Sequence, residues 1–316
     1  MKINPRLISG ALALTLVSTL TSQAWDTQGH MMVAGVAYKK LTKQTKNRVD
    51  TLLVLNPDRD NWLKLIPHGT SATKRKMMIF MVAATWPDRI KSDHDYHTDG
   101  SHNGNRPPND PSASQNIGYD DMARHKYWHF IDKPFSQDNT ELPPIIEPNA
   151  KTQIKAFREV LASATKPDKL KSYDLSWLLH LVGDVHQPLH CTARITATDH
   201  DGDDGGNGVK LNEVPGNLHS FWDDVLGDSE APSIALGALA DLPDAPASAA
   251  ADLDVDHWID ESFNAAKQTV YRAPIGAGAG PFTLTQPYED DARELAEQRV
   301  ALAGARLAKI LNEELK

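Results

Sequence analysis

Two histidine–aspartate pairs are the residues of this chain best suited to chemistry. In the segment LLHLVGDVHQPLH, His180 and Asp184 are four residues apart, and in GNLHSFWDDVL, His219 and Asp223 repeat that spacing. Residues four apart on an α-helix are about 40° apart around its axis, so both side chains of a pair project from one face. Neutral imidazole and carboxylate are nitrogen and oxygen ligands of zinc. Each pair therefore predicts part of a metal site.

The residues that follow the first pair should point elsewhere. His186 lies about 200° around the helix from Asp184, so it should face away, as a core or supporting histidine. Pro188 should end the helix within a residue or two. His190 then belongs to a differently directed segment.

Two shorter motifs add an aspartate and a histidine. ATWPDRI places Asp88 after a Trp-Pro turn, and YWHFID places His129 between aromatic residues. Taken singly, a surface aspartate is usually solvated, and aromatic neighbours usually indicate a core position. Taken with the two pairs, both residues extend a set of zinc-type ligands. The single cysteine, Cys191, offers neither a cysteine cluster for metal nor an internal disulfide.

Residues 1–24 have the pattern of a secretory signal peptide. The pattern consists of a positive start, an apolar run of 14 residues and a small-x-small cleavage site, namely Lys2 and Arg6, Leu7–Leu20, and Ser22-Gln23-Ala24. The run is too short to span a bilayer. We therefore expect a mature chain that begins at Trp25 and is periplasmic or secreted.

The composition indicates one globular domain over residues 25–316. The whole chain has 316 residues, 40% of them apolar and 24% charged, and no linker clearly separates two cores. Its formal charge of −9 becomes −11 when Lys2 and Arg6 are removed (−9 − 2). An acidic body argues against a broad basic footprint for duplex nucleic acid. An anionic substrate would need a local positive centre, such as metal ions.

Helical periodicity dominates the elements that must position these residues. Apolar residues recur at steps of three and four in five segments, 30–41, 74–84, 152–162, 175–185 and 296–311. Alternating strand patterns are nearly absent. Three stretches are irregular, namely 91–126, 198–208 and 228–254. The first is long enough to act as a lid or a substrate-contacting flap. The sequence predicts a single, mainly α domain with long irregular loops.

Six motifs, in this order along the chain, resemble the S1/P1 nuclease family. They are WDTQGH, AATWPDRI, YWHFID, LLHLVGDVHQPLH, DGGN and NLHSFWDD. Members of this family are zinc-dependent enzymes that cut single-stranded nucleic acid and remove the 3′-phosphate of nucleotides. The resemblance covers nearly the whole chain after residue 24. It implies a mainly helical phospholipase C/P1 nuclease-like fold that holds three zinc ions.

The resemblance also implies which residues hold the metal. The first zinc would be bound by Asp88, His129, His180 and Asp184. The second would be bound by His30, by the bridging carboxylate of Asp184, and by the amino group and carbonyl oxygen of Trp25. The third would be bound by His190, His219 and Asp223. A free α-amino group has an ordinary pKa of about 7.7 to 8, so its use as a ligand is feasible near neutral pH.

The implied reaction is hydrolysis of a phosphodiester to a 5′-phosphorylated product. A hydroxide shared by the first two zinc ions, beside Asp88 and Asp184, would be the nucleophile, and the third zinc would stabilise the leaving 3′-oxygen. Arg89 or Lys91, which follow Asp88, would help to hold the phosphate. A solvated turn charge is an equally good interpretation of either residue.

The resemblance further implies a base-binding pocket. Phe130 would stack on an unpaired base and Asp132 would accept from base-edge donors, so single-stranded DNA, single-stranded RNA and 3′-nucleotides would bind better than duplex. Core packing is the alternative for Phe130. Asn207, with Gly205 and Gly206, matches a family loop near the cleft, although a turn explains them equally well. We expect a monomer that binds no membrane.

Two other functions use similar residues. A zinc-dependent phospholipase C resembles this family in its fold and zinc cluster, but the short Trp25 to His30 spacing and the FID segment favour the nuclease. An exported zinc-storage protein would present flexible histidines such as His94, His97 and His102, which are otherwise expected to be solvated. Such a protein has little need for a carboxylate that brings two ions together.

Overall fold

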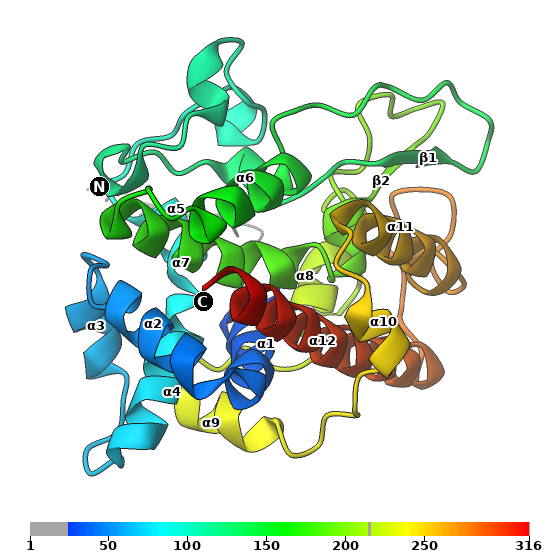
Figure 1. Cartoon of the computed structure of the whole chain (residues 1–316). Helices are drawn as coiled ribbons and strands as arrows, with labels where there is room; N and C mark the ends of the chain where they lie inside the picture. Colours follow the sequence, from blue (N-terminus) through cyan, green and yellow to red (C-terminus); the bar gives the residue numbers. More distant parts are fainter. Residues whose placement is uncertain (1–24, 214–215, 316) are drawn as a thin grey trace, which may run out of the picture.

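Helices make up most of the chain, as the sequence predicts. The computed structural model describes residues 25–213 and 216–315, and short strands are the minor component of this part (Figure 1). The predicted signal peptide, residues 1–24, lies outside the described residues.

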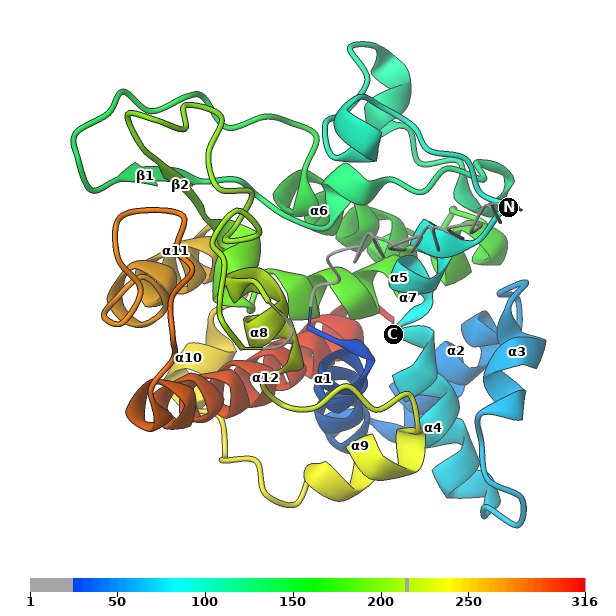
Figure 2. The ribbon, with the colours of Figure 1, turned by 180° about the vertical axis from the view of Figure 1, so that it is seen from behind.

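Three long helices form the centre of the fold, namely α1 (Thr27–Lys40), α7 (Asp168–Asp184) and α12 (Gln286–Glu314). Helices α1 and α12 lie side by side in both views (Figures 1 and 2). Gly304 of α12 permits this close packing, because a Cβ atom there would lie 2.5 Å from the Cβ of Val36. Helix α7 contacts both α1 and α12. The C-terminal end of α7 is therefore held inside the molecule.

The other helices surround this centre. They are α2 (Lys43–Leu53), α3 (Arg59–Lys64), α4 (Ala72–Ala83), α5 (Trp86–Ser92), α6 (Ala150–Ala162), α8 (Leu218–Asp224), α9 (Pro232–Ala238), α10 (Ala247–Ala251) and α11 (Val255–Ala265), which continues into a π-helical turn (Ala266–Val270). Two short strands, β1 (Pro134–Ser136) and β2 (Ala193–Ile195), pair in parallel with Pro134 opposite Ala193.

The five predicted helical segments are confirmed as α1, α4, α6, α7 and α12. Each begins earlier than its apolar period, because the first turns are polar. At α1 and α6 a capping side chain also marks the start of the helix. Asp26 accepts a hydrogen bond from the backbone N of Thr27 at the start of α1. Asn149 and Thr152 form a capping box at the start of α6. Helix ends therefore follow polar signals that hydrophobic periodicity does not contain.

Two expectations about local structure are wrong. The segment 228–254, expected to be irregular, contains α9 and α10. Alanine has the highest helix propensity, and Pro232 occupies the first position of α9, where proline is tolerated. Asp88 does not follow a Trp-Pro turn but lies in the first turn of α5, with Pro87 at the start of that helix.

A cluster of buried aromatic rings packs against α5 and α7. Trp86 meets the rings of Tyr173 and Trp177 edge-on, with centroids 5.8 and 6.2 Å away, and Trp128 lies 5.1 Å from Trp177. Large rings bury much apolar area and have few rotamers, so they fix the elements that carry them. The cluster holds α5, α7 and the segment before His129 in fixed relative positions.

The long stretch 91–126 is irregular beyond the end of α5, apart from short 3₁₀ turns. His125 joins two parts of this stretch. Its Nδ1 atom lies 2.9 Å from Asp99 Oδ2, and its Nε2 atom lies 2.7 Å from Asp121 Oδ2. Its ring also stacks on Trp128. Burial opposes a charge on His125, but hydrogen bonds to Asp121 and Asp99 raise its pKa. A buried imidazole between two carboxylates therefore holds this stretch against the core.

Asp174 in α7 provides a test of stability against pH. Its carboxylate oxygens accept hydrogen bonds of 2.8 and 2.9 Å from Asn116, and burial raises its pKa to about 8. The pKa of an unfolded aspartate is about 3.9, so between pH 4 and 8 the folded state binds the extra proton and stability falls as pH rises. We expect Asp174→Asn to stabilise the fold by an amount that grows by up to about 1.4 kcal/mol per pH unit over this range. Urea unfolding of both proteins at pH 5 and pH 8 measures it, and equal gains at both pH values would contradict the prediction.

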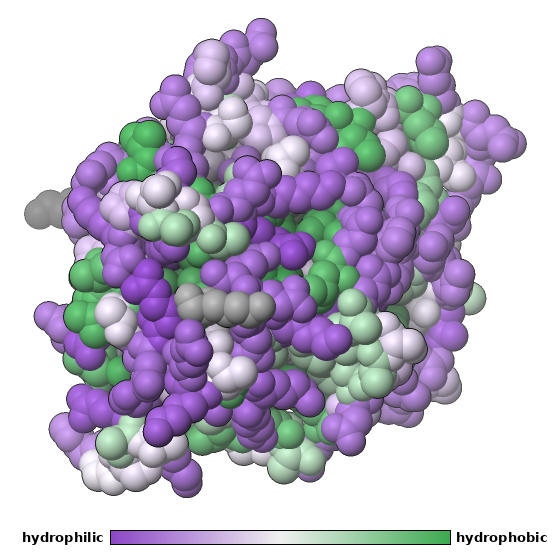
Figure 3. Space-filling model, in the orientation of Figure 1, coloured by the Kyte–Doolittle hydropathy of each residue, from purple (hydrophilic) through white to green (hydrophobic). Residues whose placement is uncertain are grey.

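The surface shown in Figure 3 is mostly hydrophilic, with apolar side chains in small separate areas. Among the described residues, no helix combines the length and the apolar character needed to cross a membrane.

Candidate metal centre

A first group of four donor atoms comes from three parts of the chain. Asp88 lies on α5, His180 and Asp184 on α7, and His129 directly after a 3₁₀ turn. His129 Nδ1 lies 2.9 Å from His180 Nε2, 3.2 Å from Asp184 Oδ2 and 3.7 Å from Asp88 Oδ1. His180 Nε2 lies 3.3 Å from Asp184 Oδ2 and 3.5 Å from Asp88 Oδ1. The donors of a tetrahedral zinc site, with bonds of about 2.0 to 2.1 Å, are about 3.3 Å apart, so these atoms fit such a site.

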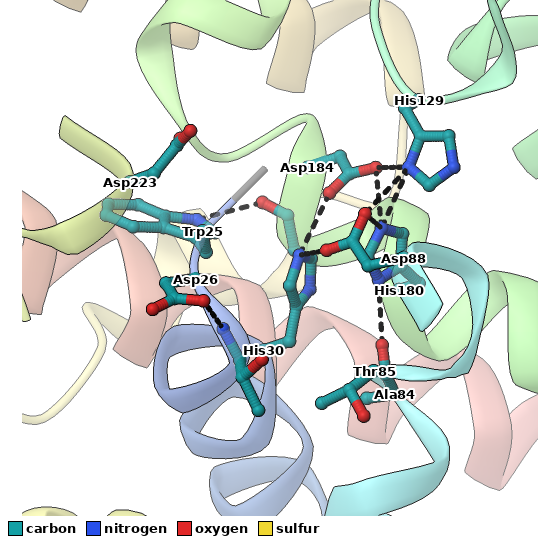
Figure 4. Close-up of polar contacts among 12 residues, drawn as sticks. Trp25, Asp26, His30, Ala84, Thr85, Asp88, His129, His180, Asp184 and Asp223 are labelled. Carbon is teal, nitrogen blue, oxygen red and sulfur yellow. Dashed lines mark hydrogen bonds and ion pairs between the residues drawn. The ribbon is translucent and has the colours of Figure 1, made fainter. Parts of the chain in front are cut away.

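His30 on α1 creates a second group beside the first. Its Nε2 atom lies 3.3 Å from Asp184 Oδ1 and 3.8 Å from Asp88 Oδ2. Both carboxylates therefore turn one oxygen toward His30 and the other toward His129 and His180 (Figure 4). This is the arrangement of carboxylates shared between two neighbouring metal ions.

The second histidine–aspartate pair forms a third group with His190. His219 Nε2 lies 3.4 Å from Asp223 Oδ2 and 3.1 Å from His190 Nε2. His219 and Asp223 share one face of α8, and His180 and Asp184 share one face of α7, so the predicted helix-face geometry is confirmed for both pairs. His190 approaches from the 3₁₀ turn Pro188–Cys191 that follows α7.

Backbone carbonyl groups orient three of these histidines. The Nδ1 atoms of His180, His190 and His219 lie 2.7, 2.9 and 2.7 Å from the carbonyl oxygens of Ala84, His129 and Gly205. A carbonyl oxygen can only accept, so each Nδ1 carries the proton and each Nε2 is left with its lone pair facing the group. Gly205 has φ +61°, and a Cβ atom there would lie 2.6 Å from the carbonyl oxygen of Leu189. Only glycine allows this carbonyl to approach His219 so closely.

Burial keeps four of the five candidate histidine ligands neutral, which is the form that binds metal. Burial also opposes a charge on the fifth, His180, but the charges of Asp184 and Asp88 raise its pKa. Burial lowers the pKa of His129 and His190 to about 3 and that of His219 to about 4, and it also lowers the pKa of His30. Within residues 25–213 and 216–315, neither ring nitrogen of His30 has a hydrogen-bond partner, and neither does Asp184 Oδ1, although all three atoms are buried. Buried polar atoms normally have hydrogen-bond partners, so these unsatisfied atoms are suited to bind a cation.

The carboxylates of the centre respond to their surroundings in opposite ways. Burial raises the pKa of Asp223 well above its usual value. Burial also opposes ionisation of Asp88, but the charges of Lys91 and His180 hold its pKa well below the usual range. A metal ion beside Asp223 would supply the positive charge that this buried carboxylate otherwise lacks.

Lys91, rather than Arg89, reaches the centre. Lys91 Nζ lies 2.7 Å from Asp88 Oδ1, and its side chain is 6% exposed, so the interpretation of a solvated charge is wrong for this residue. Arg89 Nε instead donates to Thr85 Oγ1 at 3.1 Å, at the start of the same helix. The buried ammonium group adds a positive charge next to the shared carboxylates.

Trp25 is fully buried at the start of the described chain. Its Nε1 atom donates to the carbonyl oxygen of Gly183 at 3.1 Å (Figure 4). The backbone N of Asp26 donates to the carbonyl oxygen of Asp223 at 3.1 Å. These bonds hold the main chain of Trp25 between the end of α7 and α8, near His30. A Cβ atom on Gly183 would lie 2.8 Å from His30 Nδ1, so the glycine makes room for that histidine.

The residues expected to bind the nucleotide lie beside the third group. The backbone N of Ile131 donates to the carbonyl oxygen of His190 at 2.7 Å, which attaches Phe130 and Asp132 to that group. Phe130 is only partly buried, so it is not a core residue. The Asp132 side chain reaches the surface. Its pKa is nevertheless raised to about 7, because the surrounding protein displaces water from the carboxyl group and because Asp204 and Asp203 add negative charge nearby.

Asn207 belongs to the turn that supports His219 of the third group. Its Nδ2 atom donates to the carbonyl oxygen of Asp204 at 2.8 Å, and Gly205 in the same turn binds His219. The turn explanation of this loop is therefore confirmed, and the loop contacts the third group through the carbonyl oxygen of Gly205. By contrast, His94 is exposed beside Asp93 and Asp95 and belongs to none of the three buried groups, although it lines the same cavity as Asp88.

Sequence reasoning missed Gln187, which belongs to the centre. It is fully buried, and its Nε2 atom donates to Asp223 Oδ1 at 2.7 Å. The other oxygen, Asp223 Oδ2, is thereby left to face His219. A polar residue inside a motif full of candidate ligands is the signal that could have found it.

A sequence model of the S1/P1 nuclease family matches residues 25–316. The chain belongs to the S1/P1 nuclease family. It is 26% identical to Endonuclease 4 of Arabidopsis thaliana over 230 residues, which cover 61% of this chain and 73% of the relative. It is also 26% identical to Endonuclease 5 of Arabidopsis thaliana over 255 residues, which cover 72% of this chain and 75% of the relative. The resemblance seen in the six motifs is therefore confirmed.

Membership of this family makes the protein a nuclease, that is, a hydrolase of phosphodiester bonds. S1/P1 nucleases depend on metal ions, and this S1/P1 nuclease has three buried groups of histidine and aspartate that could hold them.

Proposed function

We propose that this protein is a zinc-dependent enzyme that hydrolyses single-stranded DNA and RNA to 5′-phosphorylated products and removes the 3′-phosphate of nucleotides. The observation that carries the proposal is the sharing of Asp88 and Asp184 between His30 on one side and His129 and His180 on the other. Shared carboxylates place two metal ions close together, as in two-metal phosphodiesterases.

The donor set favours zinc among the common divalent ions. Imidazole nitrogen with carboxylate oxygen suits zinc, whereas magnesium and calcium prefer oxygen ligands alone. We propose three zinc ions, the first on Asp88, His129, His180 and Asp184, the second on His30, Asp184 and the terminal amino group and carbonyl oxygen of Trp25, and the third on His190, His219 and Asp223.

The charge of such a centre suits an anionic substrate. Three divalent ions bring six positive charges against three carboxylates, which leaves an excess of three in a chain whose formal charge is −9. Lys91 adds a further positive charge beside Asp88. The phosphate would therefore be attracted to this locally positive centre of an acidic protein.

The residues of the chain position the reaction. Zinc bound here would supply Lewis acidity, which lowers the pKa of water toward 7 and polarises phosphate oxygens. Asp88 holds the Lys91 ammonium group at the centre, where it is placed to contact a phosphate oxygen. Phe130 and Asp132 lie next to the third group and would hold the base of the nucleoside whose 3′-oxygen is released, on the 5′ side of that phosphate.

A base-stacking role for Phe130 predicts a specific loss. We expect Phe130→Ala to raise the KM for single-stranded DNA and 3′-AMP, at a cost of about 1 to 3 kcal/mol per stacked base, because the base loses its stacking partner. Zinc content should stay unchanged, since no donor atom is altered. Steady-state kinetics and mass spectrometry measure both quantities. Unchanged kinetics would remove Phe130 from the site, and an unfolded variant would mean that it supports the core.

A terminal ligand at Trp25 predicts that the nitrogen must be free. In a chain extended by one residue this nitrogen is an amide, whose lone pair is delocalised and does not bind zinc. We expect protein with one extra residue before Trp25 to bind one zinc ion less tightly and to turn over more slowly than protein that begins at Trp25. Equal zinc content and equal turnover of single-stranded DNA in the two forms would exclude Trp25 as a ligand.

The same requirement supports export. We propose that residues 1–24 are removed as a signal peptide and that a periplasmic or secreted monomer results. N-terminal sequencing of the protein recovered from the periplasm or medium tests the cleavage, and light scattering tests the monomer.

Turnover of a panel of substrates, measured on one preparation of the protein, tests the proposed substrate class. We expect turnover of single-stranded DNA, single-stranded RNA and 3′-AMP, slower cleavage of duplex DNA, and no turnover of phosphatidylcholine. Preference for phosphatidylcholine would point to a phospholipase C. A preparation that holds three zinc ions but hydrolyses none of these substrates would support a zinc-binding protein without catalysis.

A further inference from the structure

One short segment, residues 184–190, serves all three candidate metal groups. Asp184 turns its two oxygens to the first and second groups. Gln187 donates to Asp223 of the third group, and His190 belongs to that group itself. A shift of this segment would therefore move donor atoms in every group at once.

A buried charged network holds the side of this segment that faces away from the metal groups. Arg299 on α12 donates from Nε to the carbonyl oxygen of His186 at 3.1 Å. Its Nη2 atom donates to Ser262 Oγ at 2.6 Å, and this hydroxyl donates to the carbonyl oxygen of Val185 at 2.6 Å. Two consecutive carbonyl groups after α7 are thus fixed by α11 and α12.

Arg306 lies about two turns beyond Arg299 on α12 and fixes the last turn of α7 through His186. Its Nη1 atom lies 2.9 Å from His186 Nε2. Arginine can only donate, so His186 accepts at Nε2 and donates from Nδ1 to the carbonyl oxygen of Val182 at 2.8 Å. His186 therefore faces away from Asp184, as its helical position predicts, and supports the same segment from behind.

Glu261 joins the two arginines into one unit. It accepts two hydrogen bonds of 2.7 Å from Arg306 and one of 2.9 Å from Arg299. Arg306 is fully buried and Arg299 is 7% exposed. Ion networks of this kind often stabilise a fold no better than apolar residues of the same size, because the buried charges lose their hydration. The network does, however, bind the carbonyl groups of Val185 and His186 through Ser262 and Arg299, so it can fix the position of the chain after α7.

We propose that Arg299 and Arg306, joined by Glu261, are positioning residues that fix segment 184–190 so that Asp184 presents one oxygen to each of two metal ions. The proposal rests on the metal ligands assigned under the proposed function. Neither arginine touches a donor atom of the three groups, so each acts only through the backbone and through His186.

The test compares Arg299→Met and Arg306→Met with a matched control, Arg158→Met. Arg158 also pairs with a glutamate of α12, Glu314 at 2.7 Å, and donates to a backbone carbonyl group, that of Leu253 at 3.0 Å, but has no contact with segment 184–190. Zinc affinity is measured by competition with a chromophoric chelator, coordination geometry by the absorption spectrum of the Co²⁺-substituted protein, and stability by the Tm of the metal-free protein.

We expect both test variants to bind zinc about 10- to 100-fold more weakly than the control, the range typical of residues that support a metal ligand. The Co²⁺ spectrum should change in both, while the Tm of the metal-free protein falls no further than in Arg158→Met. If a methionine variant does not fold, Arg306→Lys replaces it in the test. The lysine keeps the buried charge but cannot bind His186 and Glu261 at the same time. It should also weaken zinc binding.

Zinc affinities within about twofold of the control, with an unchanged Co²⁺ spectrum, would overturn the positioning role. A wild-type protein that binds no zinc would instead overturn the ligand assignment. The two failures are therefore distinguishable, and neither depends on nuclease activity.

Discussion

Asp184→Asn is expected to lose two metal ions and all measurable nuclease activity. Asp184 is the carboxylate that lies 3.3 Å from both His30 Nε2 and His180 Nε2 through different oxygens. An amide offers one oxygen ligand and no negative charge, so it cannot bridge two ions. We expect metal affinity to fall by more than the roughly 10- to 100-fold typical of a supporting residue. Metal analysis by mass spectrometry and turnover of single-stranded DNA measure the loss.

The control for this variant is the same substitution on the same helix. Asp174 is a buried carboxylate of α7 that binds Asn116 and belongs to none of the three metal groups. Asp174→Asn should retain all metal and activity. His186→Gln should also retain most of the metal, because its ring faces away from Asp184. Equal metal loss in Asp184→Asn and His186→Gln would contradict the helix-face geometry.

Removal of metal should abolish activity and lower the Tm by about 10 °C or more. An ion at about 1,000 times its Kd stabilises the folded state by about 4 kcal/mol, and about 1 kcal/mol shifts the Tm of a domain of this size by about 2 to 4 °C. The donors come from five separate parts of the sequence, so the metal-free protein loses the bonds that join them. In the part of the chain that the structure describes, the ring nitrogens of His30 and the Oδ1 atom of Asp184 are buried and have no hydrogen-bond partner, so metal removal leaves them unsatisfied.

The measurement is circular dichroism on protein dialysed against a chelator, with metal content checked in the same sample. Zinc should restore both Tm and activity, whereas magnesium should not, because it prefers oxygen ligands in an octahedron. A metal-free sample with full activity and an unchanged Tm would refute metal dependence for this chain.

Local spacing was sufficient for the parts of the site that lie within one element. His180 and Asp184, and likewise His219 and Asp223, were assigned to common helix faces from a four-residue spacing, and α7 and α8 place them so. The same helix geometry predicted that His186 faces away from Asp184, and its contacts with Val182 and Arg306 confirm this. These predictions succeed because helix geometry depends only on positions along the chain.

The sequence by itself determined the mainly helical class, the two ligand pairs and, through the order of six motifs, the family. Only the tertiary structure decided that Asp88, like Asp184, turns one oxygen to each of two groups, that Lys91 is buried against Asp88, and that Gln187 orients Asp223. It also brought Arg299 and Arg306 behind His186, across more than a hundred residues of sequence. Such contacts depend on how α5, α7, α8 and α12 pack against one another, and periodicity within a single helix carries no information about which helix lies opposite its face.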